Sequence, residues 1–286
     1  MRVLLMANYE KPAVVEALRT VRPWLEARAR IVAEIDAGRD GPLEDVVNEG
    51  VDLVIVLGGD GTLLGQARRV VDLEAPIVGV NFGKLGFLAE FSREDLEREW
   101  HCIAGGACKI SQRVMIEAKV FERGKQAAAF SSRAMNDCVI TAGRPFRMID
   151  LELSINPRPN GGGTIFGGDG VIIATPSGST AYNASAGGPI IAPDVDALVV
   201  TPICPQSLAF RSIVTHGEDH IRVTLHEANA GTTLVIDGQE SHPLTAGSRL
   251  HVTRHPRRLQ LVTNPQTPYW RRLAKKMHWA ASPRHA

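Results

Sequence analysis

The residues best suited to chemistry stand in GGDGT (58–62), which begins at the last residue of the apolar run DLVIVLG (52–58). A strand that ends in glycines lets a ligand approach the main chain closely. If TLLGQARR (62–69) begins a helix, its first N–H groups point to the same place. The stretch therefore predicts a loop for the phosphates of a donor molecule, made by Gly58, Gly59, Gly61 and Thr62.

Asp60 lies inside this loop, where its charge would repel phosphate. The residue is therefore expected to take a proton from an attacking hydroxyl, or to bind a divalent metal that carries the phosphates. A structural alternative is a tight turn in which Asp60 caps the helix. Neither a GxxxxGK[ST] loop nor a GxGxxG fingerprint occurs here, so the common nucleotide motifs do not decide between these alternatives.

A second candidate is GGDGVIIATPSGSTAYNASAGGPI (167–190), where an aspartate follows glycines and small hydroxyl residues surround Tyr182. Small residues allow a planar ligand to approach, hydroxyls can bond its polar edges, and a tyrosine ring offers an apolar face. The segment predicts a nucleotide site. The alternative is a small-residue packing segment at the entry from a strand to a helix.

Composition excludes several classes of protein. The 286 residues carry a net charge of +1, which gives no overall attraction to nucleic acid or anionic membranes. No apolar run is long enough to span a membrane, and MRVLLMANYE is too quickly interrupted for a signal peptide. We expect a cytoplasmic protein without nucleic-acid or membrane partners.

The cysteines show no spacing typical of a metal site, and the histidines are scattered. Cys102, Cys108, Cys138 and Cys204 form no CxxC pair, and the histidines form no HxH pair. We expect four reduced thiols and no protein-bound metal cluster.

Strands and helices alternate in the first part of the chain. Apolar runs predict strands over 2–7, 30–35, 52–58 and 75–83, and periodic patterns predict helices over 11–29, 62–73 and 93–106. This order predicts an α/β domain with a parallel sheet over 1–107. From about residue 108 short β-branched runs dominate, which predicts a β-rich domain over 108–264.

The tail returns to helical spacing. Its predicted apolar side is Trp270, Leu273, Met277 and Trp279, which we expect to dock on the first domain, so that 265–286 complete it.

Several motifs occur in an order that resembles the bacterial ATP-dependent NAD kinase family over nearly the full length. They are GGDGT (58–62), NFGKLGFLAE (81–90), MNDCVI (135–140), DGVIIATPSGSTAYNASAGGPI (169–190) and DGQ (237–239). GGDGT alone is shared with lipid and sphingoid kinases, so the specificity of the resemblance comes from the combination.

The resemblance implies transfer of the γ-phosphoryl group of ATP to the 2′-hydroxyl of the adenosine ribose of NAD. It implies an active site where the two domains meet, with Asp60 as the proton acceptor, Mg²⁺ as the divalent cation, and a homodimer or homotetramer. The implied NAD-binding residues are Asp60, Gly61, Asn136, Asp137, Arg147, Gly167, Asp169, Thr180, Ala181, Tyr182, Asn183, Ser185 and Gln239. Asp137 stands at a position that is often Glu. The glycines of NFGKLGFL are interpreted as structural, and Lys84 as a solvated lysine or a phosphate contact.

The chain departs from the family at Gly167, where many bacterial members have Arg. The smaller residue predicts that NADH is accepted as well as NAD. Two alternative functions remain open from the sequence. A lipid or sphingoid kinase would need a greasy acceptor cleft, against which the polar PSGSTAYNAS segment argues, and a non-catalytic NAD sensor would not need Asp60.

Overall fold

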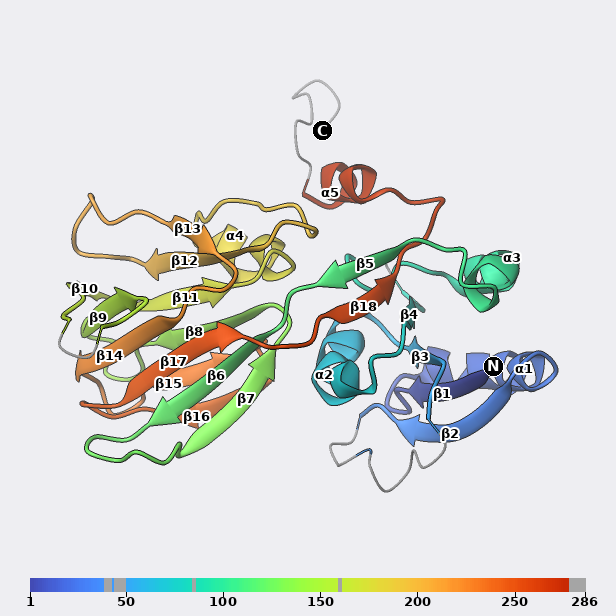
Figure 1. The fold of residues 1–286 in the computed structure, drawn as a ribbon, viewed down its shortest axis with the longest axis horizontal. Helices are drawn as coiled ribbons and strands as arrows, with labels where there is room; N and C mark the ends of the chain where they lie inside the picture. The colour runs from blue at the N-terminus through green and yellow to red at the C-terminus, as the bar shows by residue number, and fades with distance from the viewer. Residues whose placement is uncertain (39–42, 44–49, 84–85, 159–160, 278–286) are drawn as a thin grey trace. The chain divides into compact units, whose positions relative to one another are not determined.

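A computed structural model describes residues 1–38, 43, 50–83, 86–158 and 161–277. The chain forms two compact units, coloured by residue number in Figure 1. Unit 1 comprises Met1–Gln112 and the segment from Leu259 onward, and unit 2 comprises Arg113–Arg258. The two units correspond to the expected α/β and β-rich halves, which confirms the predicted fold class.

Unit 1 is built on a six-stranded sheet with the order β2-β1-β3-β4-β18-β5. All the pairs from β2 to β18 are parallel. The strands are β1 (Arg2–Ala7), β2 (Arg30–Asp36), β3 (Leu53–Leu57), β4 (Ile77–Val80), β5 (Ile110–Arg113) and β18 (Leu259–Val262). The helices are α1 (Pro12–Glu26), α2 (Asp60–Val70), the 3₁₀ turn η1 (Val71–Leu73), α3 (Arg93–Ala104) and α5 (Tyr269–Met277).

Helices cover the two faces of this sheet, which explains its continuous apolar strands (Figure 1). All five residues of β3 are buried. Helix α1 buries one stripe at helical spacing, namely Val14, Leu18, Val21 and Leu25. The start of α3 is fixed by a capping box, in which Ser92 and Asp95 bond each other's backbone N–H.

Unit 2 is a sandwich of two antiparallel six-stranded sheets, β10-β9-β14-β17-β6-β7 and β13-β12-β11-β8-β15-β16. The first sheet contains β6 (Ile116–Phe121), β7 (Phe130–Ala134), β9 (Ile149–Ile155), β10 (Thr164–Gly168), β14 (Ile221–Glu227) and β17 (Arg249–Arg254). The second contains β8 (Asp137–Thr141), β11 (Gly170–Ala174), β12 (Ala197–Ile203), β13 (Ile213–His216), β15 (Thr233–Ile236) and β16 (Glu240–Pro243). Between β11 and β12 lie η2 (Gly178–Thr180) and α4 (Tyr182–Ser185).

The inner faces of these two sheets form one apolar core. Alternate residues of each strand point inward, such as Ile116 and Ala118 of β6 and Cys138 and Ile140 of β8. The run 126–141, which reads as one strand in the sequence, is divided in two. The chain leaves the first sheet after Ala134 and enters the second at Asp137.

The unit boundaries differ from the sequence boundaries of 107/108 and 264/265. The contacts place them after Gln112 and before Leu259. Two short strands account for the shift, since β5 and β18 read as part of a β-rich series but join the parallel sheet of unit 1.

The tail helix α5 belongs to unit 1, as expected, but its buried side is different. Leu273 is buried and Met277 is half-buried, whereas Trp270 is 58% exposed. Arg272 takes an inward position because it pairs with the buried Glu90, and this orients the helix with Trp270 outward. Trp279 lies outside the described residues.

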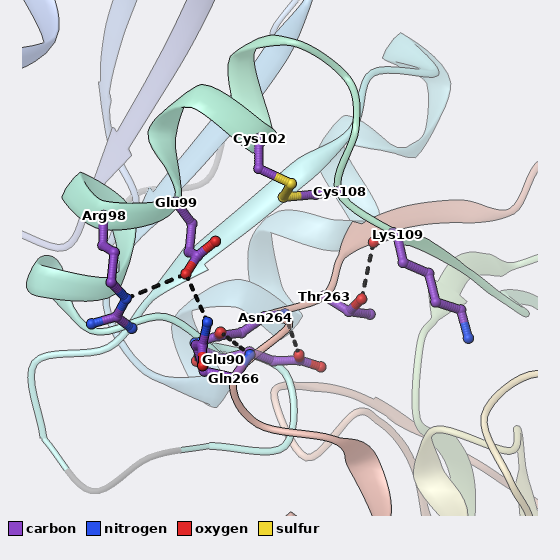
Figure 2. Close-up of a disulfide and its surroundings, with 9 residues drawn as sticks. All are labelled: Glu90, Arg98, Glu99, Cys102, Cys108, Lys109, Thr263, Asn264 and Gln266. Carbon is purple, nitrogen blue, oxygen red and sulfur yellow. Dashed lines mark hydrogen bonds and ion pairs between the residues drawn. A yellow bond between two sulfur atoms is a disulfide. The ribbon is translucent and has the colours of Figure 1, made fainter.

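The expectation of four reduced thiols is wrong for two cysteines. Cys102 and Cys108 form a disulfide at the end of α3 (Figure 2). The chain reverses at Gly105 and Gly106, where Gly106 has a φ of 67°, and this brings the two Cα atoms to 5.2 Å. Cys138 and Cys204 are free thiols.

Among the described helices, none has the length and apolar character needed to cross a bilayer.

Candidate active site

The glycine loop lies at the carboxyl ends of β1 and β3. After β1 the chain passes to β2 on one side, and after β3 it passes to β4 on the other side. In open α/β sheets, ligands bind outside the carboxyl ends of strands at such a switch point. Asn8 and Gly58 follow β1 and β3 here, and α2 begins two residues later at Asp60.

Close packing explains the glycine at position 58. A Cβ on Gly58 would lie 2.5 Å from the Cβ of Thr62. Thr62 is buried, and its hydroxyl accepts a hydrogen bond from the Asn8 amide at 3.3 Å. The buried Thr62 side chain therefore holds the loop in place. The absence of a side chain at Gly58 lets the main chain of the loop lie close to the first turn of α2.

The carboxylate of Asp60 is held by three consecutive backbone N–H groups. Phe87 donates to Oδ2 at 2.7 Å, and Leu88 and Ala89 donate to Oδ1 at 3.0 and 2.9 Å. A Cβ on Gly86 would lie 1.7 Å from Oδ1, so only glycine fits there. The glycine interpreted as structural at this point of NFGKLGFL thus makes room for Asp60.

The helix-cap alternative for Asp60 is wrong. The N-cap of α2 is Gly59, which has no side chain to bond the first turn. Asp60 is the first helical residue, and its carboxylate bonds the 87–89 segment instead.

Lys11 is a candidate residue that the sequence reasoning missed. It is the N-cap of α1, where Pro12 occupies the first turn. A Cβ built on Gly59 would lie 3.4 Å from the Lys11 ammonium, which therefore stands over the glycine loop. The signal in the sequence was a lysine shortly after the first strand, because the carboxyl end of that strand lies at the same edge of the sheet as the glycine loop. Lys84 lies outside the described residues.

Unit 2 contains a hollow of about 310 Å³ on the outer face of its second sheet. Val139 and Val235 contribute apolar side chains, which alternate with the inward residues of β8 and β15. Its polar lining includes Asn136, Asp137 and Tyr182. The hollow is thus lined by four of the residues that the resemblance assigned to NAD, namely Asn136, Asp137, Ala181 and Tyr182.

Asp237 of the DGQ motif shapes this hollow. Its carboxylate accepts hydrogen bonds from the backbone N–H groups of Met135, Asn136 and Asp137, at 3.0, 2.8 and 3.1 Å. It therefore fixes the point where the chain crosses between sheets. The Asn136 amide oxygen is buried and has no hydrogen-bond partner within the described part of the chain.

Asp137 has an unusual electrostatic environment. Burial, followed by the negative charge of Asp237, raises the pKa of Asp137 to about 7. No side chain or backbone group among the described residues donates a hydrogen bond to its carboxyl. Asp137 and Asn136 both have capacity for bonds from a polar ligand in the hollow.

Asn183 has a structural position. Its side chain is fully buried, donates to the carbonyls of Ser179 and Pro189 at 3.0 Å each, and accepts from the Thr201 hydroxyl at 2.7 Å. It therefore holds the 179–191 segment against β12 and has no exposed surface for a ligand.

The remaining predicted NAD residues do not line this hollow. Gly167 lines a second hollow of about 510 Å³ in unit 2, together with Asp150, Gln206 and Phe210. A Cβ on Gly167 would lie 3.2 Å from an Asp150 oxygen and 3.4 Å from a Gln206 oxygen. Others outside the lining are Arg147, Asp169, Thr180, Ser185 and Gln239, of which Arg147, Ser185 and Gln239 are exposed.

No group of three or more His, Cys, Asp or Glu side chains in the described residues could hold a metal ion. A magnesium ion usually keeps several waters and binds through one or two carboxylates together with substrate phosphates. The loop at Asp60 is compatible with this kind of binding, because it offers one carboxylate beside the glycine turn that begins α2.

Comparisons with known proteins agree for both halves of the chain. Residues 7–107 match the model of the ATP-NAD kinase N-terminal domain, and residues 135–264 match that of the ATP-NAD kinase C-terminal domain.

Curated relatives cover nearly the whole chain. The NAD kinase of Syntrophotalea carbinolica is 40% identical over 285 residues, which cover 97% of this chain and 98% of that protein. The NAD kinase of Geobacter metallireducens is 37% identical over 284 residues, with the same coverage of 97% and 98%.

Solved structures show the same fold. Yeast NADH kinase complexed with NADH has a TM-score of 0.82 at 24% identity, covering 100% of this chain and 89% of that one. An NAD kinase from Archaeoglobus fulgidus in complex with ATP has a TM-score of 0.72 at 23% identity, covering 97% of this chain and 99% of that one. With both domain models matched and 40% identity over almost the full length, this chain belongs to the NAD kinase family of ATP-dependent phosphotransferases.

Proposed function

We propose that the enzyme transfers the γ-phosphoryl group of ATP to the 2′-hydroxyl of the adenosine ribose of NAD. A bond forms between the ribose oxygen and the γ-phosphorus, and the bond from that phosphorus to the β,γ-bridging oxygen breaks. The hydroxyl proton passes to Asp60, and ADP and NADP leave. The hydrogen-bonded position of Asp60 at the glycine loop is the observation that carries this proposal.

The hydrogen bonds of Asp60 suit a positioned proton acceptor. Two carboxylate oxygens offer about four lone-pair sites. Three of them receive N–H groups from 87–89, which leaves one for the ribose hydroxyl. The rigid backbone donors fix the direction of the carboxylate, and such positioning contributes to catalysis by holding reacting groups in line.

The donor phosphates would lie on the glycine loop. Backbone N–H groups and the positive end of the α2 dipole favour anions there, and the Lys11 ammonium stands over Gly59. Magnesium would arrive bound to ATP and neutralise charge on the phosphates. Gly58, Gly59, Gly61 and Thr62 keep their proposed role as the phosphate-donor loop.

The acceptor NAD would occupy the hollow of unit 2. Hydroxyl groups of NAD can donate to the unpartnered amide oxygen of Asn136 and to Asp137. The apolar side chains of Val139 and Val235 suit one face of a base, and the ring of Tyr182 suits the other. This polar lining favours a dinucleotide over the greasy acceptor of the lipid-kinase alternative.

Two further expectations, the location in the cell and the number of subunits, belong to the same proposal. We propose a cytoplasmic enzyme that forms homodimers or homotetramers. The edge strand β13 exposes Ile213 (40%) and Val214 (54%), and an exposed apolar edge suits pairing with a second copy. Light scattering of the purified protein measures the assembly directly.

The decisive experiment is a coupled NADP assay on the purified full-length protein with NAD, ATP and Mg²⁺. Wild type should form NADP, and Asp60→Asn should lower kcat about 10²- to 10⁴-fold while binding NAD normally. Near-wild-type turnover in a folded Asp60→Asn variant would reject Asp60 as the proton acceptor. NAD binding without any ATP turnover would support the sensor alternative.

A further inference from the structure

The C-terminal helix α5 is joined to the segment that holds Asp60 by a buried ion pair. Glu90 is fully buried and Arg272 of α5 is 5% exposed, and Nη2 of Arg272 lies 2.5 Å from Oε1 of Glu90. The other oxygen of Glu90 accepts a hydrogen bond from the Asn264 backbone at 3.0 Å, in the region drawn in Figure 2. Both oxygens of this carboxylate are therefore engaged.

A second contact reaches the same segment from the next turn of α5. The Lys276 ammonium lies 4.9 Å from the ring centroid of Phe87, within the range of a cation–π contact. The backbone N–H of Phe87 is the donor to Oδ2 of Asp60. Helix α5 thus contacts both ends of the short run 87–90, of which the first three residues hold Asp60.

We propose that Arg272 is a positioning residue for phosphoryl transfer, acting through Glu90 on the N–H groups that orient Asp60. The inference rests on the proposed role of Asp60. A buried carboxylate that loses its cationic partner is left as an uncompensated charge, which is strongly unfavourable, and we expect Glu90 to shift toward water as a result. Because Glu90 directly follows Ala89, that movement pulls on the N–H groups bonded to Asp60.

Substitution of Arg272 by Met, with Arg271→Met as the matched control, tests this. Arg271 is exposed and precedes Arg272 in the same helix. Its substitution by Met therefore removes the same charge from α5 and leaves the Glu90 ion pair in place. In Arg272→Met we expect kcat to fall at least tenfold, with KM for NAD and for ATP within about threefold of wild type, because misplacement of a reacting group lowers the rate rather than the affinity. Arg271→Met should leave kcat and the KM values for NAD and for ATP at their wild-type levels.

Two more variants separate positioning from folding. Arg272→Lys keeps the charge beside Glu90 but not the Nη1 hydrogen bonds to Thr267, so it should recover part of the kcat that Arg272→Met loses. Glu90→Gln keeps the shape of the side chain and should lower kcat about tenfold, which tests the pair even if Arg272→Met does not fold. Circular dichroism and thermal melting report the folded fraction in each preparation.

The outcomes separate this inference from the proposed function. If wild type is active and Asp60→Asn is not, but folded Arg272→Met or Glu90→Gln keeps wild-type kcat, the inference alone is overturned. The same holds if the loss of kcat equals the loss of folded protein. If wild type forms no NADP, the proposed function fails and the inference fails with it.

Discussion

At the residue scale, the two carboxylates proposed to act on NAD have opposite surroundings. Asp60 accepts three backbone N–H groups, whereas Asp137 receives no donor to its carboxyl among the described residues and lies near Asp237. The donors of Asp60 fix the direction of its carboxylate, whereas burial and the like charge of Asp237 disfavour the ionised form of Asp137. The first arrangement suits a fixed proton acceptor, and the second makes unit 2 sensitive to pH.

The pKa of Asp137, raised from 3.8 to about 7, predicts the direction of that sensitivity. Between pH 4 and pH 7 the folded state holds a proton that the unfolded state has lost, so the stability given by protonated Asp137 disappears as the pH rises through 7. Asp137→Asn, which cannot ionise, should therefore gain stability over wild type between pH 5 and pH 8. Urea unfolding across this range measures it. Asp194 is exposed, so Asp194→Asn serves as the control. If the free energy of unfolding changes with pH equally in Asp137→Asn and in wild type, the prediction is contradicted.

Lys11 should contribute to binding of the donor. Lys11→Met removes the ammonium over Gly59, so KM for ATP should rise about tenfold, with kcat and KM for NAD nearly unchanged. Steady-state kinetics with each substrate varied in turn provides the measurement. Lys125→Met, which removes an exposed lysine of unit 2, is the matched control. An unchanged KM for ATP in the Lys11 variant would show that this lysine is merely solvated.

Gly167 should influence the choice between NAD and NADH. Wild type is expected to use both with kcat/KM values within about tenfold, which is about 1.4 kcal/mol of discrimination. Gly167→Arg should lose NADH preferentially, because a long side chain fills space beside the Asp150 carboxylate. Gly162→Arg is the matched control, because it adds the same charge at a position where a side chain would extend into open space. It should not change the discrimination between NAD and NADH. Equal discrimination by wild type and Gly167→Arg would leave Gly167 as a loop glycine.

At the element scale, α3 is fixed at its start by the capping box and at its end by a disulfide. The Cys102–Cys108 disulfide closes a short loop with a sequence separation of 6, next to β5 at the edge of the sheet (Figure 2). The chain-entropy model gives about 2 kcal/mol of stabilisation for a loop of this size.

Removing the disulfide should therefore destabilise unit 1. Cys102→Ser with Cys108→Ser should lower the free energy of unfolding by about 2 kcal/mol, measured by denaturant unfolding without reductant. Cys204→Ser changes an exposed free thiol and should have little effect. A thiol titration of the unfolded, unreduced wild type should find two free thiols, and four would show that the bond is absent.

At the scale of the whole molecule, the two units differ in chain continuity. Unit 2 is one continuous segment, Arg113–Arg258, with its own sandwich core. Unit 1 is discontinuous, because β18 from beyond residue 258 lies between β4 and β5 in its sheet. Loss of an interior strand removes backbone pairing on both sides.

This difference predicts unequal folding of the two parts. Residues 113–258 expressed alone should give a cooperative thermal transition, because a domain with its own core can fold independently. Residues 1–112 alone should show no cooperative thermal transition. Residues 1–112 joined to 259–286 through a Gly/Ser linker should show one. A cooperative transition for 1–112 alone would show that β18 and α5 are dispensable for unit 1.

Much of the architecture was predictable because it follows from local patterns. Continuous apolar runs such as LVIVL mark strands covered on both faces, and apolar residues at helical spacing mark α1. The division at Met135–Asn136 is not fixed by local propensity, because Asn and Asp are uncommon in strands and yet Asp137 begins β8. The break arises where Asp237, 100 residues away, bonds the backbone between the two sheets.

The sequence by itself determined the family, the two-part architecture and the importance of Asp60, because these depend on residue types at short spacing. Only the tertiary structure decided what surrounds them. It placed the N–H groups of 87–89 on Asp60, Lys11 over Gly59, and Cys102 against Cys108. It also turned Arg272 inward and Trp270 outward, because a buried Glu90 requires a cationic partner more strongly than one exposed indole requires burial. Contacts of this kind join residues distant in the chain, and no local pattern encodes them.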